Sequence, residues 1–217
     1  MRIVCMTNEG QLPMMKNMLN SALKSGIPMY LFHCYILESQ QDAATYGTQQ
    51  FRSITTRKLQ VIRDNMLLDD TILWVDNDIM FFENCLGDIL RRGGSFVMQD
   101  DLWGACTGFF LARTTSMSVM LLNKAIRWLI EQNNTSLNDQ HAFNAVRKLS
   151  WGTTVTLLPQ DEYPNGKVYF EEDRKSKAKM VHSNYLATTA EKVDRFKQMG
   201  LWNDSDEGFN LANKYSI

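Results

Sequence analysis

The chain has 217 residues, 44% of them hydrophobic and 22% charged, which is the composition of a globular protein with a substantial core. Lys and Arg number 23 against 24 Asp and Glu, so the formal net charge of -1 favours neither a nucleic-acid partner nor an anionic membrane surface. No apolar run has membrane-spanning length or the form of a signal peptide, and we therefore expect a cytoplasmic protein or a fragment of a longer chain.

Short apolar runs alternate with helical periodicities along the sequence. In the first part, strands are expected at 3–7, 29–36 and 71–75, and helices at 11–25 and from Thr55 or Thr56 to Met66. Further strands are expected at 95–98, 108–112 and 153–158, and further helices at about 115–132 and 138–149. The last part is expected to form a turn and edge strand at 163–170, a return to the sheet at 180–185, and a last helix from Thr189. This order predicts an α/β fold with a mostly parallel central sheet and helices on both faces, in a single domain over residues 1–217.

The four cysteines are widely spaced in apolar surroundings, and none forms a C-x-x-C pair. A zinc ribbon or a thioredoxin-type site is therefore not indicated. Two disulfides are possible in number, but the apolar surroundings favour buried free thiols in a reducing compartment.

The segment "ILWVDNDIMFF" (72–82) carries two carboxylates into the end of an apolar strand. Ligands of open α/β sheets bind at the carboxyl ends of the strands, and residues i and i+2 of an extended chain point the same way. Asp76 and Asp78 can therefore face one pocket, where a Mg²⁺ or Mn²⁺ ion that also takes phosphate oxygens would relieve their repulsion. The alternative is that Asp76 starts a turn and that Asn77 and Asp78 cap it.

Several further motifs follow in a fixed order: "MTNEG", "TTRKLQVIRDNML", "TGFFLARTT", "NDQHAFN", "LPQDEYPNGKVYF" and "VHSNY". Together with the D-x-D segment, this series resembles the GT-A nucleotide-diphospho-sugar transferases, in particular the family of plant and algal xylosyl- and galactosyltransferases. It is also similar to small glycosyltransferase domains of large viruses that infect chlorella-like algae, which implies a viral protein in the host-cell cytoplasm. The resemblance covers nearly the whole chain and implies a single GT-A, Rossmann-like domain.

The resemblance implies roles for individual residues around a nucleotide. Those expected to bind the nucleotide-sugar donor are Thr7, Asn8, Arg57, Lys58, Asp76, Asn77, Gly108, Gln140 and Lys192, with Gly108 beside the sugar. Those expected to bind the metal are Asp78, His182 and Asp76, with Asp76 also reaching the ribose. Each has a plain structural alternative: a turn at Thr7 and Asn8, a solvated helix face for the lysines and Arg57, a packed imidazole for His182, and a strand start for Gly108.

Two carboxylates are the candidates for catalytic groups under this resemblance. Asp139, in the first turn of a helix that Asn138 can cap, is implied to lie against the donor sugar, although a helix start also favours an acid on its own. Asp101 ends another strand on the same edge and could hold sugar hydroxyls or be a solvated turn residue. Thr107 stands where the family has an asparagine, which puts the identity of the sugar in doubt.

The implied activity is metal-dependent transfer of a hexosyl unit from a UDP-sugar, such as UDP-glucose, to a glycan or another hydroxyl acceptor. Mn²⁺ or Mg²⁺ would act as a Lewis acid on the departing diphosphate. The family resembled is largely retaining, which favours retention. Two alternatives are a phosphatase of the haloacid-dehalogenase type, which also carries D-x-D after a strand, and a non-catalytic sugar-nucleotide binding module.

Overall fold

A computed structural model of the chain describes residues 1–37, 47–132, 134–172 and 176–214. Within this part of the chain, a six-stranded sheet has the order β2-β1-β3-β6-β5-β7. The strands are β1 (Arg2–Asn8), β2 (Phe32–Leu37), β3 (Thr71–Val75), β5 (Phe96–Asp100), β6 (Ala105–Arg113) and β7 (Val155–Leu158). Only β6 runs antiparallel to its neighbours in this sheet, so the prediction of a mostly parallel α/β sheet is confirmed.

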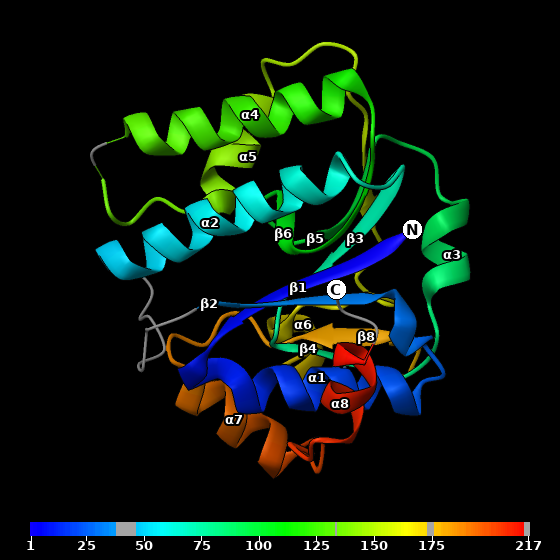
Figure 1. Cartoon of the computed structure of the whole chain (residues 1–217). Coiled ribbons are helices and arrows are strands. Elements are labelled where there is room, and N and C mark those ends of the chain that lie inside the picture. The colour runs from blue at the N-terminus through cyan, green and yellow to red at the C-terminus, as the bar shows by residue number, and fades with distance from the viewer. Residues whose placement is uncertain (38–46, 133, 173–175, 215–217) are drawn as a thin grey trace.

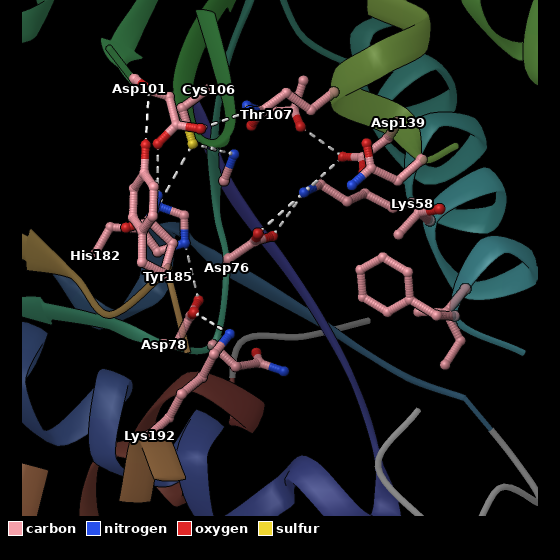
Figure 2. Close-up of a pocket in the computed structure, with 18 of the residues that line it drawn as sticks. Lys58, Asp76, Asp78, Asp101, Cys106, Thr107, Asp139, His182, Tyr185 and Lys192 are labelled. Carbon is pink, nitrogen blue, oxygen red and sulfur yellow. Dashed lines mark hydrogen bonds and ion pairs between the residues drawn. The ribbon is translucent and has the colours of Figure 1, made fainter. Parts of the chain in front are cut away.

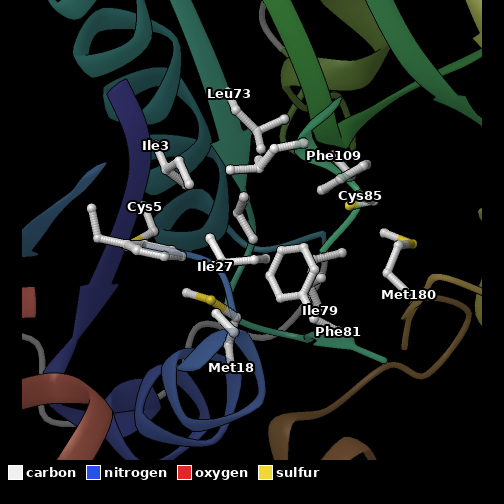
Figure 3. Close-up of a cluster of buried hydrophobic side chains, with 14 of the residues drawn as sticks. Ile3, Cys5, Met18, Ile27, Leu73, Ile79, Phe81, Cys85, Phe109 and Met180 are labelled. Carbon is white, nitrogen blue, oxygen red and sulfur yellow. The ribbon is translucent and has the colours of Figure 1, made fainter. Parts of the chain in front are cut away.

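Helices cover both faces of this sheet (Figure 1). One face packs against α1 (Leu12–Lys24) and α8 (Glu207–Asn213), and the other against α2 (Gln49–Met66), α4 (Ser116–Glu131) and α5 (Asp139–Arg147). Alternate residues of a strand point to opposite faces, and β3 shows this clearly. Leu73, labelled in Figure 3, and Val75 join the core beneath α1. Ile72 and Trp74 join the core beneath α2 and α4.

A second, two-stranded sheet lies beside the first and pairs β4 (Ile79–Phe81) with β8 (Met180–His182) in antiparallel register. Ile79 is the register partner of His182. The prediction that 180–185 returns to the main sheet is therefore wrong. The short α6 (Gly166–Phe170) contacts β8, and α7 (Thr189–Gln198) contributes Phe196 to a small cluster beside this sheet, while α3 (Leu86–Arg91) follows β4. The pairing brings a histidine late in the sequence next to the residues that follow β3.

Three local predictions differ from the structure. Helix α2 begins at Gln49, because the side chain of Thr48 caps it; Thr55 and Thr56 lie inside the helix, where their hydroxyls donate to the Arg52 carbonyl. Within 163–170, where a turn and an edge strand are expected, residues Gly166–Phe170 instead form α6, whose start is capped by Asn165. Residues 29–31 form a 3-10 turn before β2.

The four cysteines are free, as predicted, and Cys5 and Cys34 face each other across β1 and β2 with their Sγ atoms 3.4 Å apart. Among the described residues, no helix combines the length and the apolar character that crossing a membrane requires.

Candidate active site

A cavity of ≈ 660 Å³ opens beside the carboxyl end of β3, a size suited to a small-molecule ligand (Figure 2). Its walls come from α2, β3, β6, α5 and the segment between β8 and α7. The predicted residues that line it are Lys58, Asp76, Asn77, Asp78, Asp101, Gly108, Asp139, Gln140, His182 and Lys192. The structure thus brings together residues that the sequence separates by more than a hundred positions.

Asp76, Asp78 and His182 form the candidate metal site. Each offers one ligand atom, and these atoms all lie within 4.8 Å of one another. Nε2 of His182 stands 3.2 Å from Oδ1 of Asp78, and both side chains are buried. The antiparallel pairing of β4 with β8 fixes this approach, because the Ser183 N–H also donates to the Asp78 carbonyl at 2.9 Å. Two carboxylates and an imidazole suit a divalent cation such as Mn²⁺.

Gln99 orients the imidazole of His182. The Gln99 amide nitrogen donates to the carbonyls of Tyr163 (3.1 Å) and Pro164 (2.8 Å), so its oxygen, 2.9 Å from Nδ1 of His182, must accept. Nδ1 therefore carries a proton, and Nε2 is the nitrogen whose lone pair can face a cation. A hydrogen bond of this kind is the usual support for a metal-binding histidine.

Burial and charge act against each other in this cluster. Burial disfavours ionised Asp78, but the charges of Lys192 and His182 hold the pKa of Asp78 well below its ordinary value. Burial also disfavours the charged form of His182, which by itself would lower its pKa. The carboxylate of Asp78 outweighs this effect and raises the pKa of His182 well above its ordinary value. The pKa of Asp76 is raised, because burial and the charge of Asp78 both disfavour its ionised form. The charge of Lys58 only partly offsets these two effects. Binding of a cation to Nε2 would therefore have to release a proton from His182.

Two lysines compensate the negative charge of the acids in the cavity. Nζ of Lys192, at the start of α7, lies 2.7 Å from Oδ2 of Asp78. Nζ of Lys58 lies 2.9 Å from both Asp76 Oδ1 and Asp139 Oδ2, and the Trp74 indole donates to Asp76 at 2.7 Å. Lys58 thus ties the carboxylate that follows β3 to the one at the start of α5, as Figure 2 shows.

The wall formed by β6 and α5 is held by neutral groups. The hydroxyl of Thr107 donates to Asp139 at 2.7 Å, and the Gln140 side chain donates to Asp101 at 2.6 Å. Asn138 caps α5 as predicted, through the backbone N–H of His141. Although Thr107 departs from the family pattern, its hydroxyl therefore fixes the position of the Asp139 carboxylate.

Three of the predicted residues do not line the cavity. The Thr7 hydroxyl donates to the Asn8 carbonyl, and Asn8 uses its side-chain oxygen to cap the 3-10 turn that follows β1. Both are buried away from the cavity wall. Arg57 is exposed and donates to Gln60, because one residue along a helix is a rotation of about 100° away from Lys58.

Residues that the sequence did not single out also shape the cavity: Phe51, Ile54, Trp74, Trp103 and Tyr185. Tyr185 lies in the "VHSNY" segment and Trp103 in the turn after β5, so proximity to a recognised motif was the available signal. Gln99 had no such signal, because its partner His182 is 83 positions away.

Comparison with known proteins agrees with this geometry. The sequence model of the nucleotide-diphospho-sugar transferases matches residues 16–196. The chain is 25% identical over 193 residues to UDP-D-xylose:L-fucose alpha-1,3-D-xylosyltransferase 3 of Arabidopsis thaliana, which covers 75% of this chain and 50% of that protein. It is 25% identical over 207 residues to the UDP-galactose:fucoside alpha-3-galactosyltransferase of Dictyostelium discoideum, which covers 79% of this chain and 31% of that protein. The chain thus spans half or less of the length of these relatives.

Solved structures share the fold. A glycosyltransferase involved in the glycosylation of the major capsid of PBCV-1 superposes with a TM-score of 0.64 at 13% identity, over 91% of this chain and 100% of that one. The galactosyltransferase LgtC, in complex with donor and acceptor sugar analogs, superposes with a TM-score of 0.59 at 12% identity, over 100% of this chain and 97% of that one. The expected GT-A fold is confirmed, and the match to the family model over most of the sequence shows that this chain belongs to the nucleotide-diphospho-sugar transferases.

Proposed function

We propose that this protein transfers a hexosyl unit from a UDP-sugar, such as UDP-glucose, to a hydroxyl group of a glycan or another acceptor, with Mn²⁺ or Mg²⁺ and with retention of configuration. The observation that carries the proposal is the cluster of Asp76, Asp78 and His182 in the cavity of a nucleotide-diphospho-sugar transferase. A cytoplasmic location and a viral source remain part of the proposal.

The residues present fit a divalent cation. The three ligand atoms are close enough to share one ion, and Gln99 presents Nε2 of His182 toward it. Gly108 faces the same place: a Cβ built there would overlap Cε1 of His182 and stand 2.9 Å from Asp76 Oδ2, so the absent side chain leaves room for the ligands. When bound there, the cation would supply Lewis-acid stabilisation to the diphosphate leaving group.

The two lysines act differently in this proposal. Lys192 is the cation that can approach the phosphate oxygens, because its ammonium lies at Asp78 on the cavity wall. Lys58 is buried beneath Asp76 and Asp139, so it orients carboxylates instead of binding the donor itself. Asp139, held by Lys58 and Thr107, keeps a negative charge where the donor sugar would develop positive charge at its anomeric carbon.

The names of the relatives support a UDP-sugar donor and retention, although only the galactosyltransferase has a hexosyl donor. Both describe transfer from a UDP-sugar to a fucose or fucoside, with an alpha-linked product. An alpha product from an alpha-linked UDP-sugar keeps the configuration of the anomeric carbon. The family match argues against the haloacid-dehalogenase alternative, which would also leave the "DQHAFN" helix without a role.

The proposed function is tested by incubating the protein with Mn²⁺ and a panel of UDP- and GDP-sugars and measuring the free nucleoside diphosphate. UDP should be released from a UDP-hexose, and EDTA should stop the release. Tight binding of UDP-sugars without turnover, even with acceptors supplied, would identify a non-catalytic binding module instead. Turnover that EDTA leaves unchanged would contradict the metal site.

Replacing Gln99 by Met should weaken Mn²⁺ binding by about 10- to 100-fold, the usual effect of removing the group that orients a metal-binding histidine. Met fills a similar volume, but its thioether sulfur is only a weak acceptor for the Nδ1–H of His182. Isothermal titration calorimetry with Mn²⁺ measures the effect, and thermal unfolding reports the separate loss of the bonds to the carbonyls of Tyr163 and Pro164. The matched control is Gln198→Met, at an exposed position of α7. Equal Mn²⁺ affinities for the two variants would show that Gln99 does not orient His182 for the metal.

A further inference from the structure

The cavity has two ends of different character. Among the described residues that line it, the basic side chains apart from histidines are Lys58 and Lys192, and both contact the acids at the candidate metal site. At the other end, the Asp101 carboxylate accepts from Gln140 (2.6 Å) and Asn184 (2.8 Å), and none of the ion pairs formed by the described residues involves it. A cation bound at the candidate metal site, together with Lys192, would favour an anionic ligand at the first end, whereas the Asp101 carboxylate would repel one at the second.

Two aromatic side chains stand at this second end. Trp103 is 89% exposed and Tyr185 is 46% exposed, yet both line the cavity. Exposure on this scale means that the indole of Trp103 contributes little to the core. An exposed aromatic ring beside a buried polar cluster is instead typical of a binding surface.

The backbone holds Trp103 in place although its ring is free. The turn between β5 and β6 is closed by the Asp101 N–H donating to the Gly104 carbonyl (2.9 Å) and the Trp103 N–H donating to the Asp101 carbonyl (2.7 Å). Leu102 adopts a positive φ of 62° within this turn. The Tyr185 hydroxyl donates to the same Asp101 carbonyl at 2.9 Å, so it ties the segment after β8 to the turn. The two rings thus belong to one connected wall, part of which Figure 2 shows at Asp101 and Tyr185.

We propose that the wall formed by Asp101, Trp103 and Tyr185 binds the acceptor, and that the acceptor is an uncharged pyranose ring of a carbohydrate. This inference rests on the proposed function, because it assigns the donor to the lysine end of the same cavity. A pyranose has an apolar C–H face that can cover the Trp103 ring, and hydroxyls at its edge that can donate to the Asp101 carboxylate. A lipid would need a continuous apolar surface, whereas this wall carries Asp101, Gln140 and Asn184 beside the rings.

The test uses the whole protein with Mn²⁺, the UDP-sugar that it hydrolyses, and a panel of methyl pyranosides of different stereochemistry. A serine-containing peptide and a long-chain alkanol are the competing acceptors. The measured quantities are the KM for the acceptor and the ratio of transfer to donor hydrolysis. Trp103→Ala should raise the acceptor KM by about three- to tenfold, the loss expected for one ring-stacking contact, and should lower the ratio correspondingly. Trp103→Phe should restore part of both.

Trp151 provides a matched control, because it is 90% exposed and does not line the cavity. Trp151→Ala should leave the acceptor KM and the ratio unchanged. Equal acceptor KM values for the two alanine variants would overturn the proposal. The proposal would also be overturned if the wild-type protein released UDP but used the peptide or the alkanol better than every pyranoside, or used no pyranoside at all. The proposed function would survive each of these results. Failure of the wild-type protein to release UDP from any donor would instead contradict the proposed function itself.

Discussion

Asp78→Asn is expected to reduce Mn²⁺-dependent release of UDP by about 10³-fold, which is the scale of loss when a preorganised electrostatic contact to a leaving group is removed. The amide keeps the shape of the carboxylate but not its charge. Asp78 is buried, it contacts both His182 and Lys192, and its backbone carbonyl holds Ser183. The substitution therefore removes a metal ligand without removing the backbone contact that joins β4 to β8.

The fold should survive this change, and the far-ultraviolet circular dichroism spectrum should match that of the wild-type protein. Calorimetry should show that the heat of Mn²⁺ binding is lost. Asp204→Asn makes the same chemical change at an exposed position away from the cavity and should leave both measurements unchanged. An Asp78→Asn protein that retained Mn²⁺-dependent turnover within tenfold of wild type would show that the ion, if used, binds elsewhere.

Local sequence patterns were sufficient to predict those residues of the site that follow directly from a single strand or begin a single helix. A buried strand followed by Asp76-Asn77-Asp78 positions both acids at the carboxyl edge of the sheet, and Asn138 capping α5 places Asp139 and Gln140 in its first turn. The expected extended chain at 76–78 is instead a turn between β3 and β4, in which the Ile79 N–H donates to the Asp76 carbonyl at 3.2 Å, and this turn places both acids in the cavity. For Asp139 and Gln140, the periodicity of the helix fixes where the side chains point. The central sheet was predictable for the same reason, since its strands are apolar runs with helical segments between them.

Contacts between distant segments were not predictable in this way. β4 and β8 span three residues each, too few for a recognisable alternation, and their pairing alone brings His182 to Asp78. The roles of Gln99 and of Lys58 as a bridge depend on the packing of whole elements. The segment 163–170 was misread because "VYF" has the character of a strand, whereas the side chain of Asn165 caps a helical turn there.

Gly108→Ala is expected to lower Mn²⁺-dependent turnover by about 10²-fold or more, although it adds only one methyl group. Gly108 lies in β6, and its carbonyl accepts from the Asp76 N–H at 2.8 Å, so the strand cannot move away from the acids without breaking this bond. The added Cβ would overlap Cε1 of His182 and stand 2.9 Å from both Nε2 of His182 and Oδ2 of Asp76. The imidazole cannot turn aside freely, because Gln99 and Asp78 hold its two nitrogens. The methyl group therefore displaces two of the proposed ligands, and a misplacement of about 1 Å is enough for a loss of this size.

The same substitution should also cost about 1–3 kcal/mol of folding free energy, as overpacking of a buried site usually does. For a chain of 217 residues this corresponds to a fall in the unfolding midpoint of roughly 2–12 °C. Gly93→Ala is the matched control, because a Cβ at Gly93 would meet no heavy atom within 4 Å and its φ is not in the left-handed region. That variant should keep both turnover and thermal stability. Scanning calorimetry and the UDP-release assay on the two purified variants separate the effect on stability from the effect on turnover. A Gly108→Ala protein that is destabilised but fully active would show that His182 and Asp76 need not keep these positions for turnover. That result would contradict their assignment as ligands.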